Sequence, residues 1–288
     1  MKTIDKDVLA GYNAGIEKNR LREGLGLIEL ERTKEILRQQ LPNPTKSDFD
    51  PAVVYDIGGG YGEYSYYLTS LGYEVHLYDI SEKNIEMSHD LGVEYGLTLK
   101  TAEVADARSI NRPDNSADAI LLFGPLYHIV DDSERQLCLK ECYRLLKPNG
   151  LLFTAAITRY ATTLWALTVY DKNPLLDEAA FYDMLEREIK TGDHIKNPES
   201  RYRGMGRSYF HLPDELKNEI EAAGFCDTDI RGVIGPCWLI PNLDEAWKHE
   251  TKRENIMQIV RLCEEEESIM GLSTHILSIS RKANHCGV

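Results

Sequence analysis

Short apolar runs alternate with helical stretches through the middle of the chain. We predict strands at five of these runs, which are Ala52–Ile57, Glu74–Tyr78, Leu97–Ala102, Ala119–Phe123 and Leu151–Ala156. The stretches that have helical patterning between them lie near residues 61–71, 82–95 and 133–146. Because two neighbouring parallel strands need a crossover connection, this alternation predicts a parallel sheet with helices on both faces.

The two ends of the chain extend this pattern. Residues 26–41 repeat apolar side chains at helical spacing before three prolines, so we predict a helical N-terminal cap over residues 1–50. Two late strands are predicted at Asp229–Ile234 and His275–Ser280, separated by a long acidic helical stretch from about 244 to 267. A late pair of this kind fits an antiparallel pairing at one edge of the sheet.

A glycine-rich turn follows the first predicted strand, in the sequence Asp56-Ile-Gly-Gly-Gly-Tyr-Gly62. Glycines let the backbone turn sharply and let a ligand approach it closely. Asp79 ends the second predicted strand, 21 residues after Gly58, and Asp106 follows the third. Since the carboxyl ends of parallel strands meet at one edge of a sheet, we predict that these three carboxylates meet at a ligand crevice there.

The turn departs from the dinucleotide-binding fingerprint. That fingerprint requires Gly or Ala three residues after its second glycine, whereas Glu63 stands three residues after Gly60. A carboxylate at this position would repel a pyrophosphate, while Asp56 before the turn suits a ligand with a cationic end. An NAD(P)-dependent oxidoreductase remains an alternative, and each aspartate taken alone could be a helix cap or a turn residue.

These motifs resemble those of class I S-adenosylmethionine-dependent methyltransferases. The matching segments, which cover most of residues 52–156, are Asp56–Gly62, Asp79-Ile80, Asp106-Ala107, Ala117–Phe123 and Tyr143–Gly150. The resemblance implies an α/β fold with a doubly wound, Rossmann-like, seven-stranded and mostly parallel sheet that has a final antiparallel strand. It also implies S-adenosylmethionine as cofactor and S-adenosylhomocysteine as product.

A closer resemblance, to a bacterial subgroup with the motif Gly-Pro-Leu-Tyr-His at 124–128, extends over nearly the whole chain. The cofactor-binding residues that the two resemblances imply are Tyr12, Arg20, Asp56, Gly58, Gly60, Asp79, Ile80, Asp106, Ala107 and Phe123. In this interpretation Asp79 holds the ribose and Asp106 recognises the adenine edge. The subgroup pattern Glu-Gly-Pro is broken here, because Ile234 stands where that Glu would be.

Tyr127 and His128 are the candidate catalytic residues, since their motif follows the fourth predicted strand, beside the expected place of the methyl group. His128 could deprotonate an acceptor, hydrogen-bond the carboxylate of the cofactor or cap the turn. Tyr127 could form a wall of the methyl site or be a packed aromatic. A general base is needed for hydroxyl acceptors and is optional for neutral amines or thiolates.

Residues 201–211 contain three arginines and several aromatic residues but no acid. This stretch could form a lid that pairs with a carboxylate or phosphate of the acceptor, or it could bridge to acidic surface helices. The candidate substrate-binding residues, in this stretch and elsewhere, are Arg159, Arg203, Tyr209, His211 and Trp238. For Trp238 a place in the core is the competing interpretation.

Composition narrows the possible partners. The 47 acids outnumber the 33 lysines and arginines, for a formal net charge of −14, which disfavours nucleic-acid binding. No apolar run reaches membrane-spanning length, and the chain start does not have the pattern of a signal peptide. None of the six cysteines has metal-site spacing, so we predict reduced thiols, no metal and a cytoplasmic location.

We therefore predict a cap over residues 1–50 and a methyltransferase domain over 51–288 with a substrate-covering insertion at about 157–211. The predicted activity is methyl transfer at N, O or S to a small-molecule acceptor, for which an anionic molecule is one option, by a monomer or homodimer. The alternatives are an oxidoreductase and a non-catalytic protein that binds S-adenosylmethionine.

Overall fold

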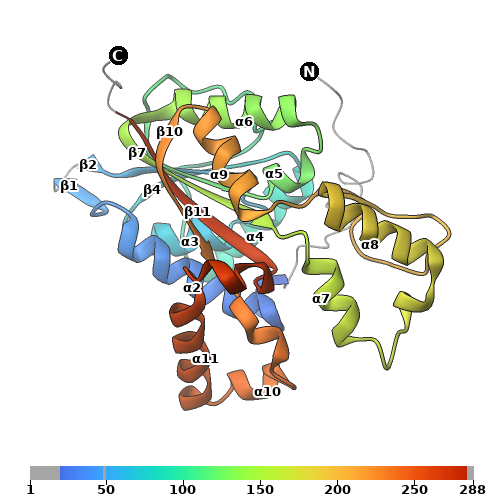
Figure 1. Cartoon of the computed structure of the whole chain (residues 1–288). Helices are drawn as coiled ribbons and strands as arrows, with labels where there is room; N and C mark the ends of the chain where they lie inside the picture. Colours follow the sequence, from blue (N-terminus) through green and yellow to red (C-terminus); the bar gives the residue numbers. More distant parts are fainter. Residues whose placement is uncertain (1–19, 48–49, 284–288) are drawn as a thin grey trace.

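The computed structural model describes residues 20–47 and 50–283, and its centre is a seven-stranded sheet (Figure 1). The strand order is β10-β11-β7-β6-β3-β4-β5. These strands are β3 (Val53–Ile57), β4 (Glu74–Asp79), β5 (Thr101–Val104), β6 (Ala117–Phe123), β7 (Leu146–Ile157), β10 (Phe225–Gly232) and β11 (His275–Lys282). Strands β3 to β7 pair in parallel, and β11 runs antiparallel to both β7 and β10. The predicted α/β fold, with its late antiparallel pair at one edge, is confirmed.

Helices cover both faces of this sheet (Figure 1). One face is covered by α2 (Leu25–Gln40), α3 (Glu63–Ser70) and α4 (Glu82–Tyr95), while α11 (Glu250–Cys263) packs against α2 and α10 (Leu243–Trp247) packs against α11. The other is covered by α5 (Pro125–His128), α6 (Asp132–Leu145) and α9 (Pro213–Ala222). The predicted helices of the central region correspond to α3, α4 and α6.

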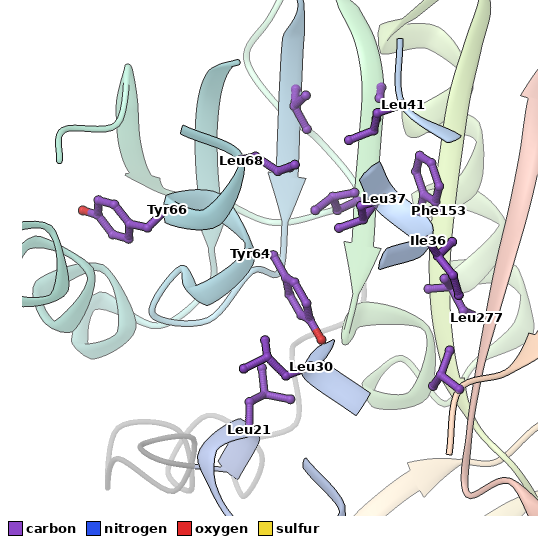
Figure 2. Packing of buried hydrophobic residues seen from close by; sticks show 14 of the residues in the cluster. Leu21, Leu30, Ile36, Leu37, Leu41, Tyr64, Tyr66, Leu68, Phe153 and Leu277 are labelled. Atoms are coloured by element: carbon purple, nitrogen blue, oxygen red, sulfur yellow. The ribbon is translucent and has the colours of Figure 1, made fainter. Parts of the chain in front are cut away.

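Successive side chains of a strand point to opposite faces of the sheet and are buried in one or the other of these two helical layers. Within β3, Val54 is buried in the α2–α3 layer, whereas Tyr55 and Ile57 are buried in the α6–α9 layer. Figure 2 shows the first layer, where α2 lies close to Phe153 of β7 and Leu277 of β11. Because both faces of the central strands are buried, their sequences are continuous apolar runs, which is why they could be recognised.

The segment after β7, predicted as an insertion at about 157–211, holds the remaining elements of the central region. They are α7 (Ala161–Thr168), a 3-10 turn η2 (Leu175–Asp177), α8 (Ala179–Thr191) and the hairpin of β8 (Asp193–Ile195) with β9 (Arg207–Tyr209). This segment has a small apolar core of its own around Phe181 and Met184. In Figure 1, α7 and α8 stand beside the sheet rather than over one of its faces.

Several element boundaries differ from prediction, among them the start of β7, which lies at Leu146 instead of Leu151. The third strand begins at Thr101 instead of Leu97, because Gly96 ends α4 in the left-handed conformation and Leu97 N–H returns to the carbonyl of Gly92. Strand β10 begins and ends earlier than the predicted Asp229–Ile234. The acidic helical stretch is broken into α10 and α11, since His249 is extended between them.

Every helix in the described part of the chain is too short or too polar to span a membrane.

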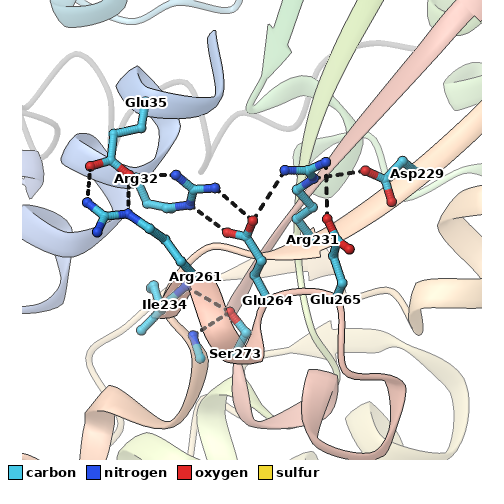
Figure 3. Close-up of polar contacts among 10 residues, drawn as sticks. Arg32, Glu35, Asp229, Arg231, Ile234, Arg261, Glu264, Glu265 and Ser273 are labelled. Carbon is cyan, nitrogen blue, oxygen red and sulfur yellow. Dashed lines mark hydrogen bonds and ion pairs between the residues drawn. The ribbon is translucent and has the colours of Figure 1, made fainter. Parts of the chain in front are cut away.

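Helix α2 is tied to the C-terminal half by a buried ionic network (Figure 3). Arg32 of α2 donates from Nε and Nη2 to the Glu264 carboxylate at 2.5 and 2.7 Å, and Arg231 Nη1 reaches the same carboxylate at 3.2 Å. The side chains of Arg32 and Glu264 are only 3% and 5% exposed. Charges removed from water need such close partners, so α2 is held against the end of α11.

Replacing Glu264 with Gln leaves two arginines without their shared buried counter-charge. We expect the Glu264→Gln variant to lose about 3 kcal/mol of unfolding free energy, measured by urea denaturation. The matched variant Glu245→Gln removes an exposed ion pair with Lys248 on α10 and should show no measurable loss. Equal stability of both variants would show that the buried network does not hold α2 in place.

Candidate functional site

A cavity of about 350 Å³ lies at the carboxyl ends of β3 to β6. Its walls come from the turns that follow these strands, from the 3-10 turn η1 (Arg20–Arg22) and from β9. The sequence-predicted residues that line it are Arg20, Gly58, Gly60, Asp79, Ile80, Asp106, Ala107, Phe123, Tyr127 and His128. This edge is the usual ligand crevice of a doubly wound sheet. Tyr12, the remaining predicted cofactor residue apart from Asp56, lies outside the described residues.

The turn after β3 needs glycine for two different reasons. Gly58 has φ 73°, and a Cβ there would come within 2.6 Å of the Pro125 ring. Gly60 has φ 60°, but a Cβ there would meet no atom within 4 Å, although Gly60 lines the cavity. The backbone at Gly60 is therefore open to close approach by a ligand.

Asp79 is fixed in place at the end of β4. Its Oδ2 accepts from Gly60 N–H at 2.9 Å, while its Oδ1 accepts from Ser81 N–H at 2.8 Å and from Asn84 Nδ2 at 3.0 Å. The side chain is thus held on the cavity wall between the turns after β3 and β4. A carboxylate held in this way is positioned to accept hydrogen bonds from a bound ligand.

Asp106 forms a charged cluster with Arg108 and Glu134. Arg108 Nε and Nη2 donate to the two oxygens of Asp106 at 2.9 and 2.6 Å, and Nη1 donates to Glu134 at 2.6 Å. Burial opposes ionisation of Asp106, but the hydrogen bonds from Arg108 outweigh it and hold its pKa below the usual value. Asp106 is therefore ionised where it lines the cavity.

The structure places Asp56 beneath the glycine turn, not on the cavity wall as the sequence predicted. Its side chain points from β3 towards α3, where Ser65 Oγ donates to Oδ2 at 2.7 Å. The other oxygen is buried and has no hydrogen-bond partner among the described residues. Burial, together with the nearby charge of Asp79, raises the pKa of Asp56 to about 7. A Cβ on Gly59 would contact this carboxyl group, so the turn covers it directly.

His128 and Tyr127 line the cavity at the end of the β6 turn, with ring centroids 4.6 Å apart. Burial, with the nearby charge of Arg20, lowers the pKa of His128 to about 3. His128 is therefore neutral at physiological pH and is a weak base. Of the roles left open above, this favours hydrogen bonding or capping over deprotonation of an acceptor.

The structure does not bring the predicted substrate-binding residues to the cavity; these were Arg159, Arg203, Tyr209, His211 and Trp238. Arg159 is buried and paired with Glu215, and Arg203 donates to carbonyls of its own loop. Trp238 packs against the main apolar core, which agrees with the competing interpretation. Arg159 and Arg203 thus have hydrogen-bond partners within the fold, which their residue types alone could not reveal.

Tyr209 and His211 instead belong to a network that supports the cavity. Arg135 lies over the Tyr209 ring at 4.0 Å and donates to Glu219 at 2.7 Å, and His211 Nε2 lies 2.9 Å from the same Glu219 carboxylate. Arg135 also donates to the carbonyls of residues 129 and 130, which line the cavity. The network links the segment after β7 to the cavity wall.

One cavity residue that sequence analysis missed is Arg207 of β9. The basic stretch 201–211 was the signal, but choosing among its arginines requires the register of the β8–β9 hairpin. That register buries Ser208 opposite His194 and leaves Arg207 exposed at the cavity. No ion pair of Arg207 occurs within residues 20–47 and 50–283. The same residues contain no cluster of three or more metal-ligating side chains.

The raised pKa of Asp56 predicts how stability depends on pH. The folded state keeps the Asp56 proton up to about pH 7, whereas the unfolded chain releases it near pH 4. The unfolding free energy of the wild type therefore falls as the pH rises between these two values. We expect the unfolding free energy of the Asp56→Asn variant not to fall in this way, because asparagine does not titrate. Relative to the wild type, the variant should gain about 2 kcal/mol of unfolding free energy between pH 5 and pH 7.

Urea unfolding of both proteins across this pH range measures the difference, and Asp90→Asn on the exposed side of α4 is the control. A constant stability difference between Asp56→Asn and the wild type would contradict the burial of a protonated Asp56.

Comparisons with known proteins agree with this geometry. Residues 55–154 match a family model described as a methyltransferase domain. A ubiquinone biosynthesis O-methyltransferase of Caulobacter vibrioides is 29% identical over 138 residues, 48% of this chain and 52% of that protein. A ubiquinone/menaquinone biosynthesis C-methyltransferase of Chromobacterium violaceum is 29% identical over 187 residues, 63% of this chain and 70% of that protein. The match to the first relative spans about half of its length.

Among solved structures, a protein of Methanosarcina mazei described as an S-adenosylmethionine-dependent methyltransferase is similar in fold. The TM-score is 0.54 at 20% identity, and the match covers 87% of this chain and 98% of that one. The predicted class I methyltransferase fold is confirmed, whereas the subgroup with the motif at 124–128 stays a prediction. Residues 55–154 are thus similar to a methyltransferase domain, and the chain shares its fold with a protein described as an S-adenosylmethionine-dependent methyltransferase.

Proposed function

We propose that this chain transfers a methyl group from S-adenosylmethionine to a small-molecule acceptor at N, O or S. The observation that carries the proposal is the arrangement of one cavity, in which the glycine turn, Asp79 and Asp106 follow three adjacent strands. When bound, the cofactor supplies an electrophilic methyl group on a sulfonium. The residues of the chain have to bind the two reactants, align them and exclude water.

The residues present fit this cofactor. Asp79 is held rigidly on the wall and would accept hydrogen bonds from the ribose hydroxyls, and Asp106 would accept from the adenine edge. Gly60 leaves room for the methionine part. The partnerless buried oxygen of Asp56 lies under this turn, where a cationic ligand would favour ionisation of the carboxyl group.

The same features disfavour a dinucleotide. Glu63 lines the cavity at the start of α3, and its carboxylate pairs with Arg22 at 2.5 Å. A pyrophosphate at the turn would have to lie near this carboxylate and above Asp56. We therefore do not propose a nicotinamide-dependent oxidoreductase.

Arg207 supports an anionic acceptor. The other two arginines of the wall are held by acids, Arg20 by Glu29 and Arg108 by Asp106 and Glu134. Arg207 has no such acid among the described residues and is exposed at the cavity. Its guanidinium would bind a carboxylate or phosphate of the acceptor through two parallel hydrogen bonds.

Incubation of the protein with a metabolite extract and S-adenosylmethionine carrying an isotopically labelled methyl group tests the activity. We expect one or more labelled small-molecule products by mass spectrometry. With a product in hand, Arg207→Gln should raise the KM for an anionic acceptor about tenfold or more, because a charge-assisted contact is lost, while the KM for S-adenosylmethionine stays unchanged.

Arg201→Gln is the matched control, because Arg201 lies in the same basic stretch and pairs with Glu178 away from the cavity. The anionic-acceptor proposal fails if both variants behave alike. The methyl-transfer proposal fails if no product is labelled and the protein binds neither S-adenosylmethionine nor S-adenosylhomocysteine.

A further inference from the structure

A buried guanidinium joins the cavity wall to the hairpin of the segment after β7. Arg135 of α6 donates from Nη1 to the carbonyls of Ile129 and Val130 at 3.2 and 2.8 Å, and both of these residues line the cavity. Its Nε donates to the Glu219 carboxylate of α9 at 2.7 Å. The Arg135 side chain is only 4% exposed, so these contacts replace the water that its charge would otherwise bind.

The face of this guanidinium lies on the aromatic ring of Tyr209 in β9. The distance from the Arg135 Cζ to the centre of the ring is 4.0 Å, at which the negative face of the ring attracts the cation. The ring also packs closely on Gly192, since a Cβ at that glycine would come within 2.9 Å of it. Tyr209 is therefore in contact both with Arg135 and with the residue before β8.

Arg207 lies on the same side of β9 as Tyr209. Side chains alternate along a strand, and burial follows this alternation, because Ser208 is buried whereas Arg207 is exposed and Tyr209 is half-buried. Strand pairing within the described residues ties β9 to β8 and not to the central sheet. The strand lies against α5, which brings Arg207 to the cavity.

The Glu219 carboxylate fixes the other partners of this contact. Its Oε1 accepts from Arg135, and its Oε2 lies 2.9 Å from Nε2 of His211, whose ring is edge-on to Tyr209 with the ring centroids 4.7 Å apart. Burial opposes ionisation of Glu219, but the hydrogen bond with His211 and the charge of Arg135 outweigh it and hold its pKa below the usual value. An ionised carboxylate therefore holds Arg135 where it meets Tyr209.

We infer that Arg135 is a positioning residue for the acceptor: through its contact with Tyr209 it fixes β9 and so sets where the Arg207 guanidinium stands at the cavity. The inference rests on the proposed function, and it names the contact on which the affinity for an anionic acceptor depends. Neither Arg135 nor Tyr209 lines the cavity, so both act through Arg207. Two parallel hydrogen bonds to a carboxylate or phosphate require a defined guanidinium position, which a loosened β9 does not provide.

Inorganic phosphate is the probe for this anion site, added to protein that is saturated with S-adenosylhomocysteine. Nitrogen-15 NMR of the arginine side chains follows Arg207, whose signal is assigned by its loss in Arg207→Gln. In the wild type we expect phosphate to shift this signal until the site is saturated. In Tyr209→Leu the dissociation constant of phosphate should rise about fivefold or more, because β9 loses the ring on which Arg135 lies.

Two further variants separate positioning from folding. Tyr209→Phe keeps the aromatic face, and Tyr182→Leu removes an exposed ring from α8 of the same segment. Both should keep the dissociation constant of phosphate within about twofold of the wild-type value, as expected where no stabilising contact is lost. The affinity for S-adenosylhomocysteine should also change less than about twofold in all of these variants, because Asp79 and Asp106 keep their places.

A double-mutant cycle tests the contact between Arg135 and Tyr209 itself. Arg135→Lys keeps the positive charge but removes the planar group that lies on the ring. It should weaken phosphate binding about as much as Tyr209→Leu does. The double variant should be no weaker than either single variant, because the same contact is lost in all three.

The outcomes separate the failures. Loss of S-adenosylhomocysteine binding in the wild type overturns the proposed function and this inference with it. A wild type that binds S-adenosylhomocysteine but whose Arg207 signal does not respond to phosphate overturns the anion site and the inference, and leaves methyl transfer standing. Unchanged phosphate affinity in Tyr209→Leu, weakened affinity in Tyr209→Phe, or additive effects in the double variant overturn the inference alone.

Discussion

The hydrogen bond from Gly60 N–H to Asp79 ties the turn after β3 to the end of β4, and the cavity depends on it. It requires the left-handed conformations of Gly58 and Gly60, which carry the backbone across the top of Asp56. The turn then leads from β3 into α3, and its residues Gly58, Gly60 and Tyr61 lie on the cavity wall. Two neighbouring carboxylates, Asp79 and Asp106, line the cavity at this edge.

The chain has a formal net charge of −14, but most acids around the cavity are paired with arginines. Arg20, Arg22 and Arg108 each hold an acid near the cavity, so most of its charge is neutralised locally. Two charged or ionisable groups near the cavity are not paired in this way among the described residues. A carboxyl oxygen of Asp56 beneath the turn has no hydrogen-bond partner, and Arg207 at the cavity has no ion pair. A ligand with a cationic centre and an acceptor with an anionic group would satisfy both.

Much of the fold and the cofactor side could be predicted from sequence. Buried parallel strands give continuous apolar runs, and carboxylates directly after such runs must lie at one edge, which is why Asp79 and Asp106 were placed correctly at the cavity. Asp56 was misplaced because a residue one position before a strand end can face either layer. Its burial follows from the side of β3 on which α3 packs.

The acceptor side depends on tertiary contacts that no short pattern records. Arg159 and His211 have partners far along the chain, and Arg207 reaches the cavity only through the register of a three-residue strand. His275 opens a late strand, and Glu29, whose Oε2 lies 3.7 Å from its Nδ1, belongs to α2. Residues that are far apart in the sequence thus become neighbours only through the order of the strands in the sheet.

Isothermal titration calorimetry of the wild-type chain with S-adenosylhomocysteine and, separately, with NADH tests the central claim most directly. The geometry of the glycine turn over Asp56, with Glu63 on the cavity wall, predicts a one-to-one binding isotherm with S-adenosylhomocysteine and no binding heat with NADH. Binding of NADH without binding of S-adenosylhomocysteine would contradict the account.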